Sequence, residues 1–235
     1  MDNPMHACPP PPALAPASRQ CYAPSHSLDR HCHYTAYATV ILGGSYLEAG
    51  DEGRHTVQAG DALVHRAYES HLDFFSARGA DVLIIPMPFA ARLPVRGRVR
   101  DVDALARMAE RSPADAWTAF AKAFEADGSG HDDWPDLLAR KLREQPDTHL
   151  GEWAEATGLR AESISRGFCR AYGISPKAYR AQVRARAAWE AICGSSLALG
   201  RLATELGFAD QAHMTRAVKS LTGHRPQAWR MAADA

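Results

Sequence analysis

The sequence lacks the features of an exported, membrane-spanning or disulfide-stabilised protein. No stretch approaches the roughly 18 consecutive apolar residues that cross a bilayer, and no basic segment followed by an apolar run opens the chain. The cysteines are odd in number, widely spaced and without a CxxC pair, which indicates a reducing compartment. They are Cys8, Cys21, Cys32, Cys169 and Cys193. We therefore expect a globular protein of the cytoplasm that has no membrane partner.

Catalytic signatures and a net charge are also missing. The chain shows no nucleophile–base constellation and no glycine-rich phosphate loop, so no enzyme is predicted. Its 27 basic and 27 acidic residues cancel, yet Arg160 to Arg230 holds 12 Lys and Arg against only 4 Asp and Glu. This local excess of +8 leaves −8 for the rest of the chain, and it favours a polyanionic partner for the C-terminal part.

The first half divides into a tail and a strand-rich segment. Residues 1–26 hold seven prolines and few large apolar side chains, which predicts a disordered tail. Residues 27–96 alternate short β-branched and aromatic runs with turn signals, which predicts a small antiparallel barrel or sandwich. The expected strands are Tyr34–Leu42, Ser45–Ala49, Arg54–Gln58, Ala62–His65, Leu72–Phe75 and Asp81–Ile85, with turns at Gly43-Gly44, Gly50-Asp51 and Gly60-Asp61.

A helical period begins after Pro94. We predict a helical linker over residues 97–130, with a boundary at Ser112-Pro113, where Ser can cap a helix and Pro suits its first position. Its apolar stripe contains Val102, Leu105, Met108, Trp117, Phe120 and Phe124. The stripe either packs on the barrel or forms a dimer interface. A polar hinge, Asp127–Asp133, leads into a helical domain over residues 131–235.

The strongest signal is an internal repeat of about 50 residues in this last domain. Trp153-Ala154…Gly158 recurs as Leu202-Ala203…Gly207, and each copy is followed by an apolar residue. Arg166 recurs as Arg216, and each is followed by a glycine, a proline and an aromatic-Arg pair: Gly173, Pro176 and Tyr179-Arg180, then Gly223, Pro226 and Trp229-Arg230. Each copy has the plan of a helix-turn-helix, with a small Ala at the helix crossing and a Gly where the turn needs a positive φ.

The second helix of each copy has a polar outer face. Helical periodicity buries Ile164 and Phe168 in one copy and Met214 and Val218 in the other. Arg can bond guanine, Gln can bond adenine, and Ser or Thr can bond either, whereas basic residues near helix ends hold phosphates. The candidate DNA-binding residues are Glu162, Ser163, Ser165, Arg166, Arg170, Gln211, His213, Thr215, Arg216 and Lys219. The alternative is a helical bundle whose polar face only meets solvent, with no DNA affinity beyond that of a mildly basic interaction module.

A long helix is expected between the copies, from Ser175-Pro176 to about Ile192. As a rigid spacer, it would let two recognition helices enter successive major-groove segments roughly 34 Å apart.

These motifs resemble the DNA-binding domain of the AraC/XylS family of transcription regulators over about Asp136 to Arg230. The most specific part is Gly207-Phe-Ala-Asp-Gln-Ala-His-Met-Thr-Arg-Ala-Val-Lys-Ser-Leu-Thr-Gly223. Departures from the family pattern are Val218, Cys169 and Arg225. The resemblance implies an α+β protein: a sensor domain, a helical linker and an all-α domain with two helix-turn-helix units. It also implies a transcription activator that binds double-stranded DNA, with RNA polymerase, a small-molecule effector and a second copy of the chain as further partners.

Residues 31–86 resemble the cupin-type sensor domains of such regulators. The resemblance rests on His31-Cys-His33, Gly43-Gly-Ser-Tyr, Gly60-Asp61, His65 and His71. It implies an effector pocket lined by some of His33, Tyr37, His65, His71 and Phe74. No cofactor is expected, but a divalent metal on His31, His33, His65 or His71 stays open.

The glutamate of metal-binding cupins is missing from this pattern, because Ala36 and Tyr37 stand in its place and the next carboxylate is Glu48. Two other interpretations remain. In one the domain only pairs subunits, and in the other the chain is a metal-dependent cupin enzyme fused to a helical domain.

Overall fold

The computed structural model describes residues 15–88, 91–128 and 133–233. These residues form two compact units, which we describe separately. The sheet unit runs up to Leu137 and includes Gly167–Ile174, and the helical unit holds Leu138–Arg166 and the chain from Ser175 onward. The predicted α+β fold, an antiparallel sheet followed by helices, is confirmed.

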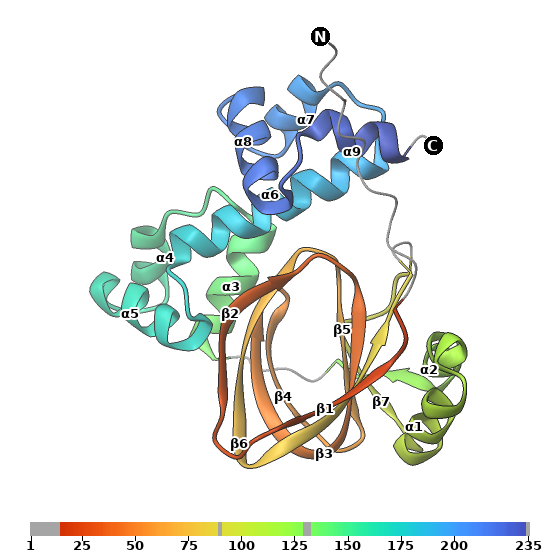
Figure 1. Ribbon diagram of the computed structural model, residues 1–235. Coiled ribbons are helices and arrows are strands. Elements are labelled where there is room, and N and C mark those ends of the chain that lie inside the picture. The colour runs from red at the N-terminus through yellow and green to blue at the C-terminus, as the bar shows by residue number, and fades with distance from the viewer. Residues whose placement is uncertain (1–14, 89–90, 129–132, 234–235) are drawn as a thin grey trace. The chain divides into compact units, whose positions relative to one another are not determined.

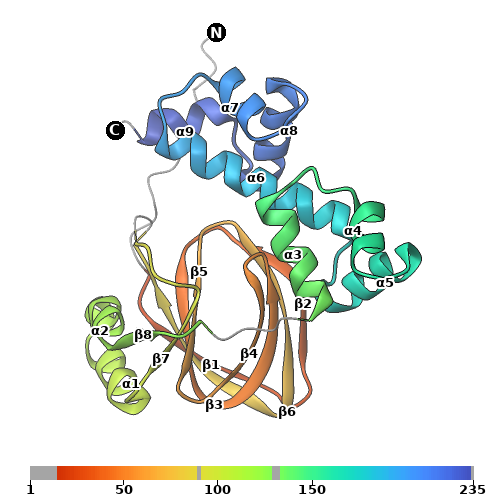
Figure 2. The same cartoon turned by 180° about the vertical axis from the view of Figure 1, so that it is seen from behind.

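Eight strands form the sheet, and every strand pair among the described residues is antiparallel. The main order is β1-β6-β3-β5-β7-β8, with β2 added on β6 and β4 added on β3. The strands are β1 (Ser18–Tyr22), β2 (Ser27–His33), β3 (Tyr37–Gly50), β4 (Gly53–Gln58), β5 (Asp61–His65), β6 (Glu69–Pro86), β7 (Arg96–Val99) and β8 (Phe124–Ala126). Figures 1 and 2 show the long strands curling the sheet into a barrel.

Two strands are much longer than the sequence predicts. The turn expected at Gly43-Gly44 is wrong, because both glycines lie inside β3, where its pairing with β6 shifts register. Gly44 has φ 72°, and a Cβ there would collide with the carbonyl oxygen of Gly79. Glycines with positive φ occur both in hairpin turns and in β-bulges, so the Gly43-Gly44 pair predicts a turn where the chain forms a bulge. The strands expected at Leu72–Phe75 and Asp81–Ile85 are likewise joined in β6.

The boundaries of the sheet also differ from the prediction. A disordered tail up to residue 26 is wrong for Ser18–Tyr22, which form β1 and pair with Ala80–Ile84 of β6. Residues 1–14 lie outside the described residues. The predicted helical linker contains strand β8, which pairs with β7 and so belongs to the sheet. These strands escape a sequence reading because their mostly exposed polar side chains form no apolar pattern, and the neighbouring strand supplies their order.

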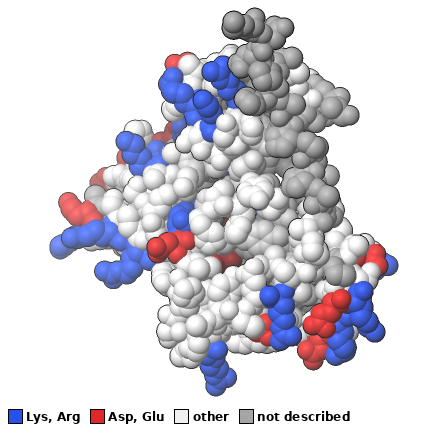
Figure 3. Space-filling model, in the orientation of Figure 1, with Lys and Arg blue, Asp and Glu red and all other residues white. Residues whose placement is uncertain are grey.

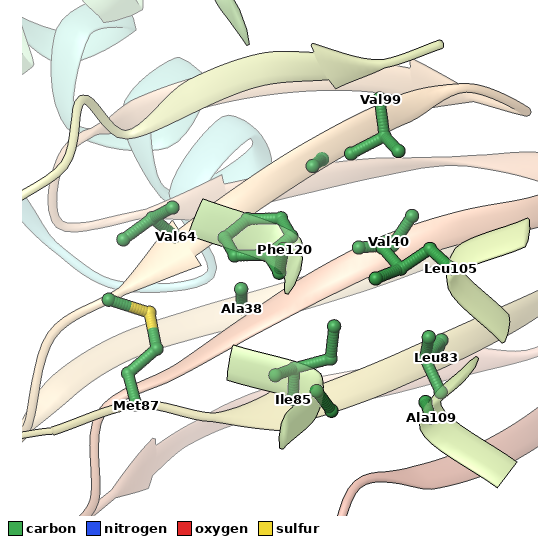
Figure 4. Packing of buried hydrophobic residues seen from close by; sticks show 12 residues of the cluster. Ala38, Val40, Val64, Leu83, Ile85, Met87, Val99, Leu105, Ala109 and Phe120 are labelled. Atoms are coloured by element: carbon green, nitrogen blue, oxygen red, sulfur yellow. The ribbon is translucent and has the colours of Figure 1, made fainter. Parts of the chain in front are cut away.

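Two helices cover one face of the barrel. They are α1 (Val102–Arg111) and α2 (Ala116–Ala123), joined by the short helix η1 (Pro113–Asp115). The predicted apolar stripe packs on the sheet, with Leu105 and Phe120 buried against Val40 and Leu83 (Figure 4). Ser112 ends α1 rather than beginning α2, because three residues of 3-10 helix intervene.

The remaining helices carry the repeat. They are α3 (Trp134–Glu144), α4 (Leu150–Ala156), α5 (Ala161–Tyr172), α6 (Pro176–Gly194), α7 (Leu199–Glu205), α8 (Gln211–Thr222) and α9 (Pro226–Ala233). The predicted long helix is confirmed as α6, capped by the Ser175 side chain, which accepts a hydrogen bond from the Ala178 amide. Among the described residues, no helix is long and apolar enough to cross a membrane.

Candidate DNA-binding face and buried histidine cluster

The predicted repeat recurs in three dimensions as two helix-turn-helix units, α4–α5 and α7–α8. Gly158 and Gly207 both have φ 69° in the turns. In each unit the residue after this glycine donates its amide hydrogen to the buried alanine of the first helix: Leu159 to Ala154 and Phe208 to Ala203, both at 2.9 Å. The two turns therefore have the same local geometry, as the sequence pattern requires.

The second helices have the buried and exposed faces that the sequence predicts. Ile164, Phe168, Met214 and Val218 are at most 1% exposed. The candidate DNA-binding residues lie on the opposite side, all exposed except Thr215, which is half-buried. Helix α8 is fixed at its start by Asp210, whose carboxylate accepts a hydrogen bond from the His213 amide at 2.6 Å.

Two arginines occupy equivalent exposed positions on these helices. Within the described ranges, neither Arg166 nor Arg216 has an ion-pair partner, so both guanidinium groups are available to an external anion. Figure 3 shows basic side chains over α5 and α8, in the left and upper parts of the view.

Other arginines of this segment hold the helices together instead. On α6, Arg180 donates to the Thr148 carbonyl before α4 at 2.7 Å, and Arg184 donates to the Gly207 carbonyl in the second turn at 2.8 Å. Arg186 is buried. The local charge of +8 therefore overstates the basic groups that can reach a phosphate.

A family model described as a helix-turn-helix domain matches residues 153–232. The C-terminal part of the chain is an AraC-type helix-turn-helix domain. Because this domain is a DNA-binding module, the protein is a DNA-binding regulator of transcription. None of the curated proteins matches the chain.

The chain is also similar to several solved structures. ToxT from Vibrio cholerae is 9% identical, with 93% of this chain and 99% of that chain covered and a TM-score of 0.41. The C-terminal domain of the response regulator AraT from Geobacillus stearothermophilus is 23% identical, with 42% and 88% covered and a TM-score of 0.37. The C-terminal domain of the response regulator yesN from Fusobacterium nucleatum is 22% identical, with 40% and 94% covered and a TM-score of 0.37.

The sheet unit holds a second candidate site, a cluster of ring and carboxylate side chains that we call the histidine cluster. It comprises His31, His33, Tyr37, Glu48, His65, His71 and Asp73. The strand register brings it together, because His31 pairs with His71, Tyr37 with His65, and Glu48 with Asp73. Four strands thus contribute to one group.

Short distances join the rings of the cluster. The His71 ring centroid lies 4.4 Å from that of His31, 5.3 Å from that of His33 and 4.8 Å from that of His65. The Tyr37 hydroxyl lies 3.4 Å from His71 Nε2, and Glu48 Oε2 lies 3.6 Å from His65 Nε2.

Burial shifts the pKa values in this cluster toward the neutral forms. It lowers the pKa of His65 to about 3, with nearby His33, His55 and His31 adding to the effect. It lowers the pKa of His71 well below the ordinary value and raises that of Asp73 to about 7. It raises the pKa of Glu48 well above the usual carboxyl range, and repulsion from Asp73 and Glu69 adds to this. Shifts of this kind are typical of functional sites.

Four of the five predicted effector-site residues lie in the cluster: His33, Tyr37, His65 and His71. Phe74 does not, because it is 46% exposed on the face of β6 opposite to His71 and Asp73. Glu48 and Asp73 are not among the site residues that the sequence predicts. The alternation of β6 from His71 to Asp73 could have revealed the second, whereas Glu48 needs the register of β3 with β6. The resemblance of this unit to cupin domains stays a prediction.

Proposed function

We propose that the AraC-type domain reads a specific DNA sequence with α5 and α8, the second helices of its two units. The observation that carries this proposal is the equivalent placement of Arg166 and Arg216, both exposed and without an ion-pair partner among the described residues. Around them stand Ser165, Gln211 and His213, whose side chains can bond base edges. Arg170 and Lys219, nearer the helix ends, are suited to phosphates.

Helix α6 supports a two-site reading of the DNA. It packs against α7, α8 and α9. Its Arg180 is hydrogen-bonded to Thr148, just before the first helix-turn-helix, and its Arg184 to Gly207, in the turn of the second. Its 19 residues span about 28 Å at 1.5 Å per residue. This length is close to the roughly 34 Å of one turn of B-DNA, so we infer that α5 and α8 occupy successive major-groove segments.

The sheet unit would then supply regulation. We propose that its histidine cluster, with His33, Tyr37, His65 and His71, binds a small effector and that this changes DNA binding or contact with RNA polymerase. Pairing of two chains would match two such domains to a repeated operator. We place such a regulator in the cytoplasm, together with the DNA that it would bind.

The test is selection of a preferred duplex from a random pool, followed by titration of full-length protein with that duplex and with a random one over a salt series. Arg216→Ala should weaken specific binding by about 1–3 kcal/mol while affecting random DNA less, because a bidentate base contact is lost. Arg78→Ala is the matched control, since it removes an exposed arginine from the sheet unit. Equal losses on both duplexes would remove Arg216 from the base-reading set, and failure to select any sequence would refute the proposal.

The buried carboxylate and imidazoles also favour a second candidate function, a metal-dependent enzyme. Two histidines and one carboxylate are the ligand set of many non-haem iron oxygenases. This alternative requires turnover of a substrate by metal-loaded protein in the absence of DNA. A protein that binds selected DNA and turns over nothing with Fe, Mn or Zn would exclude it.

A further inference from the structure

Inside the histidine cluster, two overlapping groups have the composition of a metal site. One is Glu48, His65 and His71, and the other is His31, His33 and His71. In each group, one ligand atom per residue lies within 4.8 Å of the other two. The first group is not the set that the sequence motif suggests, because its carboxylate comes from a distant part of β3.

We propose that Glu48, His65 and His71 bind one divalent ion of the first transition series. This inference rests on the proposed function, since it names the chemical class of the effector for the sheet unit. Neutral imidazole nitrogens and a carboxylate oxygen are the donors that such ions prefer. Three protein donors leave further coordination positions for water or a small anion.

The backbone fixes the three donors from three neighbouring strands. Glu48 lies on β3, His65 on β5 and His71 on β6, and these strands are adjacent in the order β6-β3-β5. Donors about 2.1 Å from a tetrahedral ion lie about 3.4 Å from one another. The 3.6 Å between Glu48 Oε2 and His65 Nε2 already meets this requirement. The other donor pairs lie within 4.8 Å, so they must approach one another by at most about 1.4 Å, which side-chain rotation can supply.

The surroundings of the buried carboxylates favour a cation as the ligand. Asp51 and Asp61, on the same barrel and equally buried, are paired with Arg30 and Arg96. By contrast, Glu48 and Asp73 are 4% and 5% exposed, and their ion-pair contacts within the described ranges are with histidines alone. The ionised form of a buried carboxylate is costly without a basic partner, and a bound dication would offset that cost.

Buried polar atoms without a hydrogen-bond partner also favour a bound ion. His65 Nδ1, His71 Nδ1 and Asp73 Oδ1 are buried and have no hydrogen-bond partner in the described part of the chain. Asp73 Oδ2 lies 3.8 Å from His71 Nε2, so this carboxylate can orient the His71 ring as an outer partner of the ion.

The competing group is less suited to hold the ion. His31 and His33 are only half-buried, and no carboxylate belongs to that group. Three neutral imidazoles would leave the full charge of the ion uncompensated, whereas Glu48 cancels part of it. Both groups contain His71, so a variant of His71 cannot tell them apart. Variants of Glu48 and His65 must be compared with variants of His31 and His33.

The experiment titrates metal-free full-length protein with Zn²⁺ and Ni²⁺ against a chromophoric chelator, with Mg²⁺ as a hard-cation control. Wild type should bind one Zn²⁺ per chain. Glu48→Gln and His65→Asn should each weaken binding by about 100-fold or more, at or above the loss usual for an outer-shell partner. The exposed His26→Asn is the matched control and should leave binding unchanged. H31N/H33N removes the competing group but keeps Glu48, His65 and His71, so it should weaken binding less than Glu48→Gln or His65→Asn does. Circular dichroism and thermal unfolding of the metal-free variants check that each one folds.

X-ray absorption of zinc-loaded wild type gives a readout that no variant can confound, with two imidazoles and oxygen donors expected. The absence of a stoichiometric ion, a shell of three imidazoles, or loss of binding in H31N/H33N with retention in Glu48→Gln would overturn the inference. Binding of the selected duplex is measured on the same samples. A protein that selects a DNA sequence but binds no metal would refute this inference alone. A protein that binds the metal but selects no DNA sequence would refute the proposed function.

Discussion

Replacing Phe120 by Ala should destabilise the sheet unit strongly. The Phe120 side chain on α2 is fully buried in the cluster with Leu105, Ala109 and the strand residues Val40 and Leu83. Truncation removes the whole ring and leaves a cavity that neighbouring strands can fill only in part. Substitutions of this type cost about 3–5 kcal/mol, which is a large part of the roughly 5–15 kcal/mol that stabilises a typical domain.

Native-state hydrogen exchange, resolved by peptide mass spectrometry, measures this loss in the sheet unit separately from the helical unit. Amides of β3 and β6 that exchange through opening of this unit should exchange about a hundred- to a few-thousand-fold faster in Phe120→Ala. Thr118→Ala, an exposed position on the same helix, should leave these rates nearly unchanged.

The same measurement at two protein concentrations separates packing from dimerisation. If the stripe of α1 and α2 stabilises the barrel within one chain, the loss is independent of concentration. A loss that appears only when the protein is concentrated would assign the stripe to an interface between chains. Unchanged exchange at both concentrations would refute the packing argument altogether.

Two further predictions concern a helix cap and a buried acid. Asp210→Ala should destabilise α8 by about 1 kcal/mol and weaken specific DNA binding, because the His213 amide loses its acceptor; Asp210→Asn, which keeps the oxygen, should restore most of both in thermal unfolding and duplex titration. Asp73 has a pKa of about 7 in the folded chain and of about 3.9 in the unfolded chain. Between pH 4 and pH 7 the folded chain therefore binds one proton more than the unfolded chain at this residue. Because of this proton, the free energy of unfolding falls as the pH rises through that range. Relative to wild type in chelator-treated buffer, Asp73→Asn should therefore gain on the order of 2 kcal/mol between pH 5 and pH 7 in urea unfolding, and a gain that does not grow with pH would contradict the assignment.

The helix-turn-helix units were predictable because their signals are local. Gly158 and Gly207 are needed for positive φ, Ala154 and Ala203 for close helix crossing, and Ser175 for a cap. Each requirement involves residues a few positions apart, and the duplication repeats it. Side-chain periodicity then determines which face of α5 and α8 is exposed.

The barrel was less predictable because its geometry depends on pairing between distant strands. The polar segment Ser18–Tyr22 is ordered by β6, about 60 residues away along the chain. The histidines of the cluster are recognisable as residue types, but Glu48 joins them only through the register of β3 with β5 and β6. The misplacement of Phe74 has the same origin, since a shift of one residue along a strand reverses the face.

Helix α6 sets a phase as well as a distance. Each residue of an α-helix rotates the downstream chain by about 100° around the helix axis, so inserting or deleting one residue in α6 would turn the second helix-turn-helix by that angle relative to the first. Substitutions on the exposed side of α6 leave this angle unchanged, whereas changes in its length do not. If α5 and α8 enter the DNA grooves as proposed, the length of this helix restricts the operators to those whose two half-sites have a matching helical offset.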